Sequence, residues 1–291
     1  MSEIRIGVIG GSGLYQMDGM KVLEERRLET PFGEPSDAFI IGELEGKKIA
    51  FLPRHGRGHR LLPSELNYRA NLFGMKMLGV EWILSVSAVG SLQLQYAPTH
   101  IVAPDQFYDR TRHRPDTFFG DGLVAHVSFA HPICEKLMGW LVEGAREAGA
   151  TVHAGGTYVC MEGPMFSTRA ESEVYRSWGM DIIGMTNLQE AKLAREAEMS
   201  YATMAMVTDY DCWHEEEADV SGVAVMEVIQ QNVRMAQEAL RNIIRRVQVD
   251  QRSPFVGILS QSLITEPSMV PEATKRKLAP IIGPYMPASA G

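Results

Sequence analysis

The chain of 291 residues is 45% hydrophobic and 22% charged, which is enough apolar material for a substantial globular core. Its formal net charge of −8 argues against a general binding surface for nucleic acid or anionic lipid. No run of about 18 uncharged apolar residues occurs, so we expect no membrane span. The three cysteines are too scattered for a disulfide framework or a zinc knuckle, and they favour a reducing cytoplasm.

Strand-like and helix-like patterns alternate along the chain. In its first third we expect strands over residues 4–9, 39–44, 48–52 and 82–87, and one helix that starts at Ser64 and is closed by Gly79. Further on we expect strands over 157–161, 181–185 and 200–208, and helices over 132–149, 169–177, 187–198 and 221–247. The alternation predicts an α/β fold, a single domain over residues 1–250 with a central mixed β-sheet flanked by helices.

Residues 251–291 differ from the rest in composition. Six prolines fall there, at positions 254, 267, 271, 280, 284 and 287. We therefore expect a proline-rich C-terminal extension, an arm or flexible segment and not a second domain.

The first candidate ligand loop runs from Gly10 to Gly13, after the first predicted strand, where α/β sheets bind their ligands. Its glycines let backbone amides approach an anion, and Ser12 adds a hydroxyl group. The spacing fits neither the dinucleotide fingerprint nor the Walker loop, and it is not a nucleophile elbow. A phosphate loop and a plain tight turn both remain open, with the turn favoured.

A cationic loop follows the hairpin predicted over 39–52. Three arginines and two histidines fall within residues 54–60 of an otherwise acidic chain. The planar fork of arginine matches the oxygens of a phosphate, but a solvated basic turn explains the same residues equally well. A metal site at His55 and His59 is a weaker interpretation, because no carboxylate or cysteine is near them in sequence.

Three further strand ends carry small or polar residues, at 87–91, 161–167 and 184–187. Each also has a structural interpretation, since small residues allow close packing and residues such as Phe166 and Met185 usually belong to a core.

The sharpest motif is the pair Asp209 and Asp211, at the end of the strand predicted over 200–208. Residues at i and i+2 of a strand share a face, so both carboxylates can bind one ligand through an amino group and a protonated ring nitrogen. A carboxyl group with a raised pKa could also donate a proton. The structural alternative is that Asp209 caps the following turn.

Read together, these segments resemble the trimeric purine nucleoside phosphorylase superfamily, and within it the enzymes that act on 5′-methylthioadenosine. The resemblance extends from the first strand to about residue 247. The segments that carry it most specifically are Arg54-His55-Gly56-Arg57, Glu162-Gly163-Pro164-Met165-Phe166-Ser167 and Thr208-Asp209-Tyr210-Asp211-Cys212-Trp213. Residues 67–71 and 105–111 also look like that family.

The resemblance implies phosphorolysis, in which inorganic phosphate attacks C1′ of the nucleoside, adenine leaves and 5-methylthioribose 1-phosphate forms. Phosphate is then a co-substrate, and no cofactor or metal is implied. The ligands of the phosphate would be Ser12, Arg54, His55, Ser87, Ala88 and Thr186. The residues around the nucleoside would be Phe166, Ser167, Met185, Thr208 and His126, with Asp209 and Asp211 as the catalytic pair at N7 and the 6-amino group.

The resemblance also implies a homotrimer or a dimer of trimers, because His126 would reach the substrate of a neighbouring subunit. The expected partners are a small nucleoside and phosphate, with no nucleic acid and no membrane. At Gln189 relatives usually carry proline, so we expect a looser start of the helix over 187–198.

The aspartate pair favours a 6-amino purine, since a buried carboxylate facing a 6-oxo group would cost a few kcal/mol. Three alternatives stay open. They are a purine nucleoside or methylthioinosine phosphorylase acting on 6-oxopurines, a non-catalytic nucleotide-binding protein, and a hydrolytic nucleosidase.

Overall fold

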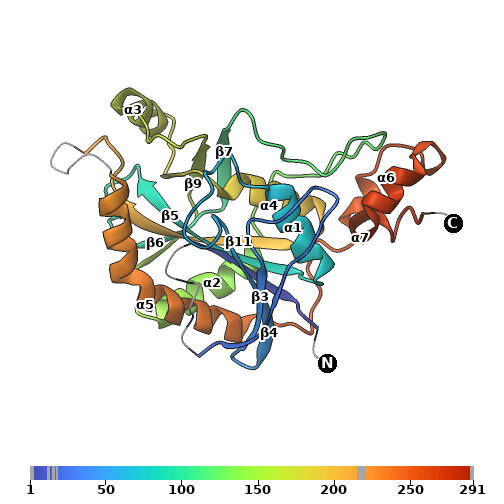
Figure 1. The fold of residues 1–291 in the computed structure, drawn as a ribbon. Coiled ribbons are helices and arrows are strands. Elements are labelled where there is room, and N and C mark those ends of the chain that lie inside the picture. Colours follow the sequence, from blue (N-terminus) through green and yellow to red (C-terminus); the bar gives the residue numbers. More distant parts are fainter. Residues whose placement is uncertain (1–2, 12–13, 15–16, 18, 215–220, 289–291) are drawn as a thin grey trace.

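A computed structural model describes residues 3–11, 14, 17, 19–214 and 221–288. These residues form one mixed sheet with helices on both sides (Figure 1). Its strands are β1 Ile6–Gly10, β2 Lys21–Arg26, β3 Phe39–Leu44, β4 Lys47–Pro53, β5 Trp82–Ser91, β6 Ile101–Ala103, β7 Gln106–Arg110, β8 Val152–Ala154, β9 Thr157–Met161, β10 Ile182–Gly184 and β11 Ser200–Asp209. The helices are α1 Tyr68–Met77, α2 Glu135–Glu147, α3 Arg169–Ser177, α4 Asn187–Glu196, α5 Gly222–Arg246, α6 Glu272–Lys277 and α7 Ala279–Ile282, with short 3₁₀ turns η1 Ile258–Gln261 and η2 Pro267–Met269.

The centre of the sheet is parallel. Strand β1 lies between β4 and β5, and β11 lies along β5, all in the same direction. Antiparallel pairs join β3 to β4 and β10 to the end of β5. The predicted mixed sheet flanked by helices is therefore confirmed, and the carboxyl ends of β1, β4, β5 and β11 share one edge.

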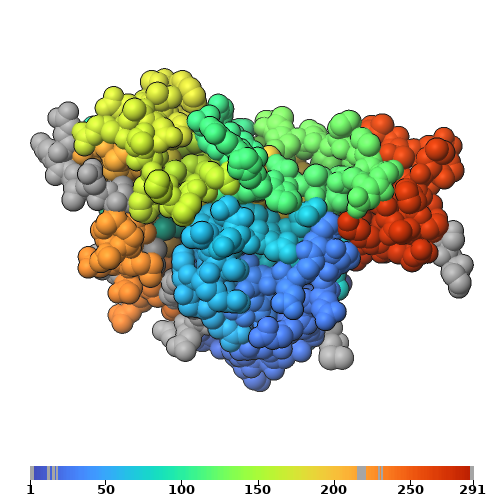
Figure 2. Space-filling view, turned by 45° about the horizontal axis from the view of Figure 1, so that its top comes forward, coloured from blue at the N-terminus to red at the C-terminus, as the bar shows by residue number. Residues whose placement is uncertain are grey.

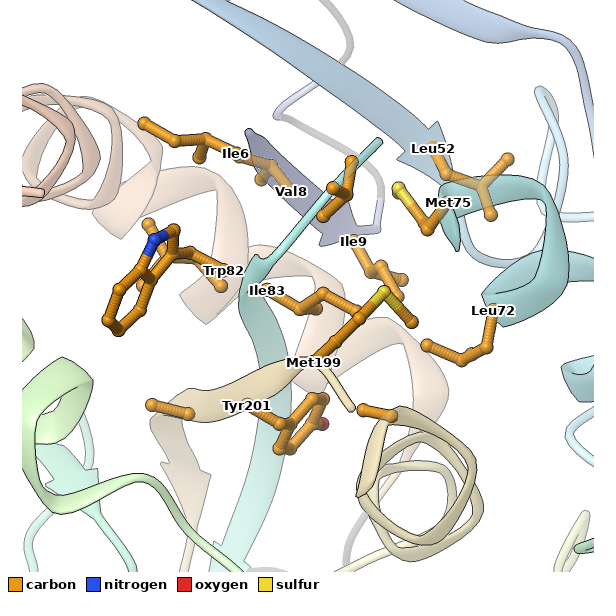
Figure 3. Packing of buried hydrophobic residues seen from close by; sticks show 14 of the residues in the cluster. Ile6, Val8, Ile9, Leu52, Leu72, Met75, Trp82, Ile83, Met199 and Tyr201 are labelled. Carbon is orange, nitrogen blue, oxygen red and sulfur yellow. The ribbon is translucent and has the colours of Figure 1, made fainter. Parts of the chain in front are cut away.

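Helices α2 and α5 lie on one side of β11, and α1 and α4 lie on the other (Figure 1). The residues of β1 are buried along its whole length, as expected for a central parallel strand covered on both faces. Figure 3 shows labelled side chains of β1, β5 and β11 in this core, with Leu72 and Met75 of α1 at one side of the view and Trp82 at the other. Trp82 contacts Trp140 of α2, with 5.2 Å between the ring centroids.

Two predicted helix starts are wrong. Helix α1 begins at Tyr68 and not at Ser64, because the Asn67 side chain accepts a hydrogen bond from the Ala70 amide at 3.1 Å and caps the helix there. Helix α2 begins at Glu135 and not at Pro132, because Cys134 is extended and its amide donates to the Tyr201 carbonyl of β11 at 2.9 Å. By contrast, the helix predicted over 221–247 agrees with α5, and the Ser221 side chain caps its start by accepting a hydrogen bond from the Ala224 amide.

The described part of the C-terminal segment, residues 251–288, is packed against the rest of the fold. Its apolar side chains Leu259, Val270, Leu278, Ile281, Ile282 and Met286 are buried in the same core cluster as β1. Its backbone pairs with the segment between β7 and α2, where the amide of His126 donates a hydrogen bond to the Ser262 carbonyl at 2.9 Å. Figure 2 shows this red segment lying against the green one. It is not a free arm, while a domain boundary at residue 250 stays a prediction.

None of the helices built from the described residues has the length and hydropathy that crossing a membrane requires.

Candidate active site

One pocket lies at the edge where the parallel strands end, and the first half of α5 forms its wall. Most of the predicted site residues line it, from five separate segments that include the carboxyl-terminal parts of β5 and β11: Arg54, His55, Ser87, Ala88, Phe166, Met185, Thr186, Thr208, Asp209 and Asp211. We call the part around Arg54 and Ser87 the arginine end and the part around Asp209 and Asp211 the aspartate end. The fold thus brings together residues that are far apart in sequence.

Three predicted site residues are not among the residues that line the pocket. Ser12 lies outside the described residues, although Gly11 beside it lines the pocket. Ser167 is adjacent to Phe166, and its carbonyl accepts a hydrogen bond from the Cys212 thiol at 3.3 Å. His126 is exposed, on the segment that pairs with the C-terminal segment.

The guanidinium of Arg54 is almost fully buried and forms a two-pronged ion pair with Glu190 of α4. Its Nε donates to Glu190 Oε1 at 2.5 Å and its Nη2 to Oε2 at 3.2 Å. Further donations reach Ser85 Oγ at 2.6 Å and the Val86 carbonyl at 2.8 Å. Burial lowers the pKa of Arg54, but the Glu190 carboxylate outweighs it and raises this pKa above its ordinary value.

A buried polar network supports this pair from below. Asn187, the first residue of α4, donates through Nδ2 to the hydroxyls of Ser85, Tyr201 and Thr203, at 3.0, 2.8 and 2.6 Å. Its Oδ1 accepts from Tyr158 at 3.1 Å. Every polar group here has a partner, which is the condition under which a buried network makes a site rigid.

A close approach at Gly184 makes room for this network. A Cβ atom at that position would lie 1.9 Å from the hydroxyl of Tyr158, so no other residue fits without moving the ring.

His55 lies beside Arg54 as a neutral imidazole. Burial and the Arg54 charge lower its pKa to about 4. Its Nδ1 lies 2.8 Å from the Leu61 carbonyl, which makes Nδ1 the donor, because a carbonyl oxygen only accepts. The ring stacks on His59 at 4.2 Å between centroids. Among the described residues, Ser87 Oγ is buried without a hydrogen-bond partner, so a hydroxyl is free for a ligand at the arginine end.

The aspartate end is built differently. Asp209 Oδ1 accepts from the Asp211 amide at 2.8 Å and its Oδ2 from Thr208 Oγ1 at 2.7 Å, so Asp209 caps the turn and faces the pocket at once. Asp211 has a left-handed backbone, with φ of 52°. Its Oδ2 is buried and makes no hydrogen bond of normal geometry in the described part of the chain, while the nearby Ser172 hydroxyl lowers the pKa of this carboxyl against the larger effect of burial.

Both carboxyl groups hold protons more tightly than usual. Burial raises the pKa of Asp209. Burial, aided by the neighbouring Asp209 carboxylate, raises the pKa of Asp211 to about 6. Two acids in this state can accept hydrogen bonds when ionised and donate when protonated.

The remaining wall of the pocket is apolar. Val225, Met226, Val233 and Ala236 line it from α5, and Leu14 lines it from the loop after β1. Phe166 stands at the mouth with 43% of its surface exposed, so its ring is available to cover a flat ligand and is not a core residue. No group of three or more His, Cys, Asp or Glu side chains within the described ranges could hold a metal ion.

Arg114 is a site-building residue that the sequence did not reveal. It is buried, and its guanidinium donates to the carbonyls of Glu162 and Met185 and to Gln189 Oε1, the last at 3.0 Å. It thereby ties the ends of β9 and β10 to α4. The expected loosening at Gln189 is wrong, because this side chain is buried and also donates to Thr111 Oγ1 at 2.8 Å.

Glu190 was missed as well. A signal for it existed, since Asn187 and Glu190 are three residues apart at the start of a helix and so share one of its faces. Some of their partners lie more than a hundred positions away along the chain, as with Arg54, which is 136 positions from Glu190, and Ser85, which is 105 positions from it. Sequence spacing does not report such pairs.

Comparison with known proteins places these features in a family. Residues 5–247 match the family described as the Phosphorylase superfamily. The S-methyl-5′-thioadenosine phosphorylase of Geobacter sulfurreducens is 57% identical over 282 residues, which are 97% of this chain and 99% of the relative. The enzyme of the same name from Gloeobacter violaceus is 57% identical over 289 residues, 97% of this chain and 96% of the relative.

Solved structures agree with the sequence relatives. The crystal structure of a methylthioadenosine phosphorylase sourced from an Antarctic soil metagenomic library is 48% identical, covers 97% of this chain and 99% of its own, and has a TM-score of 0.91. Methylthioadenosine phosphorylase from Schistosoma mansoni in complex with adenine is 36% identical, covers 89% and 99% of the two chains, and has a TM-score of 0.84.

Proposed function

This chain belongs to the phosphorylase superfamily, and from that premise we propose that it is an S-methyl-5′-thioadenosine phosphorylase. It is a pentosyltransferase that splits 5′-methylthioadenosine with inorganic phosphate into adenine and 5-methylthioribose 1-phosphate. Its place is in purine and methionine salvage.

The observation that carries the proposal is that one pocket holds both groups suited to bind phosphate and groups suited to protonate a purine base. An arginine with hydroxyl-bearing side chains lines one end, and two buried carboxyl groups with raised pKa line the other. Breaking an N-glycosidic bond builds positive charge on the sugar and negative charge on the departing base. A phosphate dianion against C1′ stabilises the first charge, and a proton donated to the base relieves the second.

At the arginine end, Arg54, Ser87 and Thr186 are the donors that we assign to phosphate, with His55, Ala88 and Ser12 beside them. The unpartnered hydroxyl of Ser87 supports this assignment. Met185 lies next to Thr186 and packs on the ribose, while the apolar wall from α5 receives the methylthio group.

At the aspartate end, Asp209 and Asp211 take the N7 and 6-amino edge of adenine, with Thr208 supporting Asp209. Phe166 and Ser167 flank the base. A raised pKa suits this role, because one carboxyl group must carry a proton for N7 while the other accepts from the amino group. A 6-oxopurine would instead place its carbonyl against a buried carboxylate.

The decisive experiment is a nucleoside panel assayed with and without phosphate. We expect adenine release from 5′-methylthioadenosine only when phosphate is present, and little turnover of inosine or methylthioinosine. Release of free methylthioribose without phosphate would identify a hydrolase instead. Ligand binding with no adenine release would identify a non-catalytic binding protein, and preference for inosine would identify a 6-oxopurine phosphorylase.

We further propose a cytoplasmic homotrimer or dimer of trimers, in which His126 reaches the 5′ end of the substrate held by a neighbouring subunit. It is exposed and is not among the residues that line the chain's own pocket, which supports this role. Mixing His126→Ala and Asp209→Asn subunits tests it. Activity should reappear in mixed assemblies, since some pockets then combine an intact Asp209 with a neighbour's His126; activity that never exceeds that of the separate variants would reject shared sites.

A further inference from the structure

The one arginine assigned to phosphate already has a counter-ion within the chain. Arg54 and Glu190 are 2% and 1% exposed, and their two-pronged contact cancels most of the arginine's charge before any ligand enters. An anion at this end of the pocket therefore meets a nearly neutral pair and not a free cation.

The hydrogen bonds of the pair are almost fully used. A guanidinium has five N–H groups, and Arg54 directs Nε, both hydrogens of Nη2 and one of Nη1 to Glu190, Ser85 and Val86. One Nη1 hydrogen is left for a ligand. The Glu190 carboxylate accepts in addition from Ser85 Oγ at 2.9 Å and from Tyr201 at 2.8 Å, so it is fixed independently of Arg54.

We propose that Glu190 is a positioning residue that sets the strength of the phosphate site, holding Arg54 in place while cancelling its charge. The inference rests on the proposed function, since it assigns phosphate to Arg54. A phosphorolysis product carries a phosphate of its own, and a site with a full buried positive charge would retain that product. The counter-charge of Glu190 weakens the hold on both anions, so that the product leaves.

The proposed role and simple support of Arg54 predict opposite changes in the KM for phosphate when Glu190 is replaced. If Glu190 only held Arg54 in place, its replacement would loosen the arginine and raise the KM for phosphate. If it sets the charge, the neutral Glu190→Gln variant exposes the arginine charge and lowers that KM. For charges several ångströms apart in a protein interior the difference is about tenfold or more.

The experiment compares Glu190→Gln with the wild type in steady-state kinetics. We expect the KM for phosphate to fall about tenfold, inhibition by 5-methylthioribose 1-phosphate to strengthen by a similar factor, and kcat to fall. A KM for phosphate that rises, or that stays unchanged, overturns the proposal.

The chain offers a matched control in Glu25→Gln. Glu25 also makes a two-pronged contact with an arginine of the same loop, Arg57, at 2.9 and 2.8 Å, but both side chains are exposed. Its replacement should leave the KM for phosphate unchanged; an equal fall in both variants would show an effect of net charge and overturn the proposal.

Loss of a buried counter-ion can unfold a protein, so the Glu190→Asp variant provides a second test of the proposal in case Glu190→Gln does not fold. It keeps the charge but withdraws it from Arg54. A smaller fall in the KM for phosphate is expected, and a rise overturns the proposal. Failure of the proposed function is distinguishable, because the wild type itself would then show no phosphate-dependent release of adenine.

Discussion

The arginine end of the pocket rests on a network of ion-paired and hydrogen-bonded side chains, whereas the aspartate end holds two buried carboxyl groups, one of which leaves an oxygen without a partner among the described residues. Arg54, Glu190 and Asn187 have their hydrogen bonds made before a ligand arrives. Asp211 leaves one oxygen without a partner, and its pKa is raised as a result of burial. The first end is preorganised for an anion, and the second is completed by the base that it binds.

The largest effect should follow from breaking the arginine end. Arg54→Ala removes a donor to phosphate and leaves Glu190 as an unpaired buried charge next to the anion. We expect kcat/KM for phosphate to fall about 10³-fold, together with a loss of stability of about 3–5 kcal/mol. Phosphate titrations of activity measure the first and denaturant unfolding the second. Arg57→Ala, in the same loop, serves as the control; an unchanged phosphate dependence in Arg54→Ala would remove Arg54 from the site.

The next effect belongs to the aspartate end. Asp209→Asn keeps the shape of the side chain and the cap on the Asp211 amide, but it removes a titratable group. Release of adenine should slow by about 10²-fold, the usual contribution of a general acid. Single-turnover assays isolate this step, and a rate close to that of the wild type would show that Asp209 is structural only.

The pH dependence of the unfolding free energy should reveal the buried carboxyl groups of the aspartate end. Because the folded-state pKa of Asp211 is raised to about 6, the folded chain holds a proton that the unfolded chain releases. Burying the ionised group is thus a penalty at pH 8 that is relieved as the pH falls through 6. Relative to Asp211→Asn, the wild type should gain roughly 1.4 kcal/mol of unfolding free energy between pH 8 and pH 5.

Urea unfolding of both proteins at the two pH values checks this, and the difference reports the coupled aspartate pair and not Asp211 alone. Since the other titrating groups are common to both proteins, a difference that does not change with pH would contradict the raised pKa.

The smallest effect should come from Thr208→Val, which deletes the hydroxyl that donates to Asp209 at 2.7 Å. That hydrogen bond favours the ionised carboxylate, so its loss should raise the pKa of Asp209 further. We expect activity above pH 7 to change by about threefold, within the range of one hydrogen bond. A pH–rate profile whose alkaline limb, where the acid loses its proton, does not move would show that this hydroxyl is not coupled to the acid.

Much of this architecture could be predicted from the sequence, because its signals are local. The buried strands, the hairpin and the extent of α5 follow from the spacing of apolar residues and from turn chemistry. The loops with Arg54 and with Asp209 could be placed at strand ends. Helix starts at Asn67 and Cys134 were missed, since one depends on which of several polar residues reaches a free amide and the other on a contact with β11.

The support behind the site could not be predicted in the same way. The partners of Glu190 and Arg114 are set by how distant strands and helices pack, and neither residue stands in a distinctive pattern. The roles of all the candidate site residues stay predictions, and among them His126 is the one that needs a second copy of the chain to be tested.

The burial of Leu259, Ile281 and Ile282 in the same cluster as β1 has a consequence for biosynthesis. The ribosome releases the chain from its N-terminus onward, so the part of α1 that packs against α7 stays uncovered until residues 259–282 emerge. This part of the core can therefore close only after those residues have been synthesised, and a chain terminated before them would expose an apolar surface that chaperones and proteases recognise.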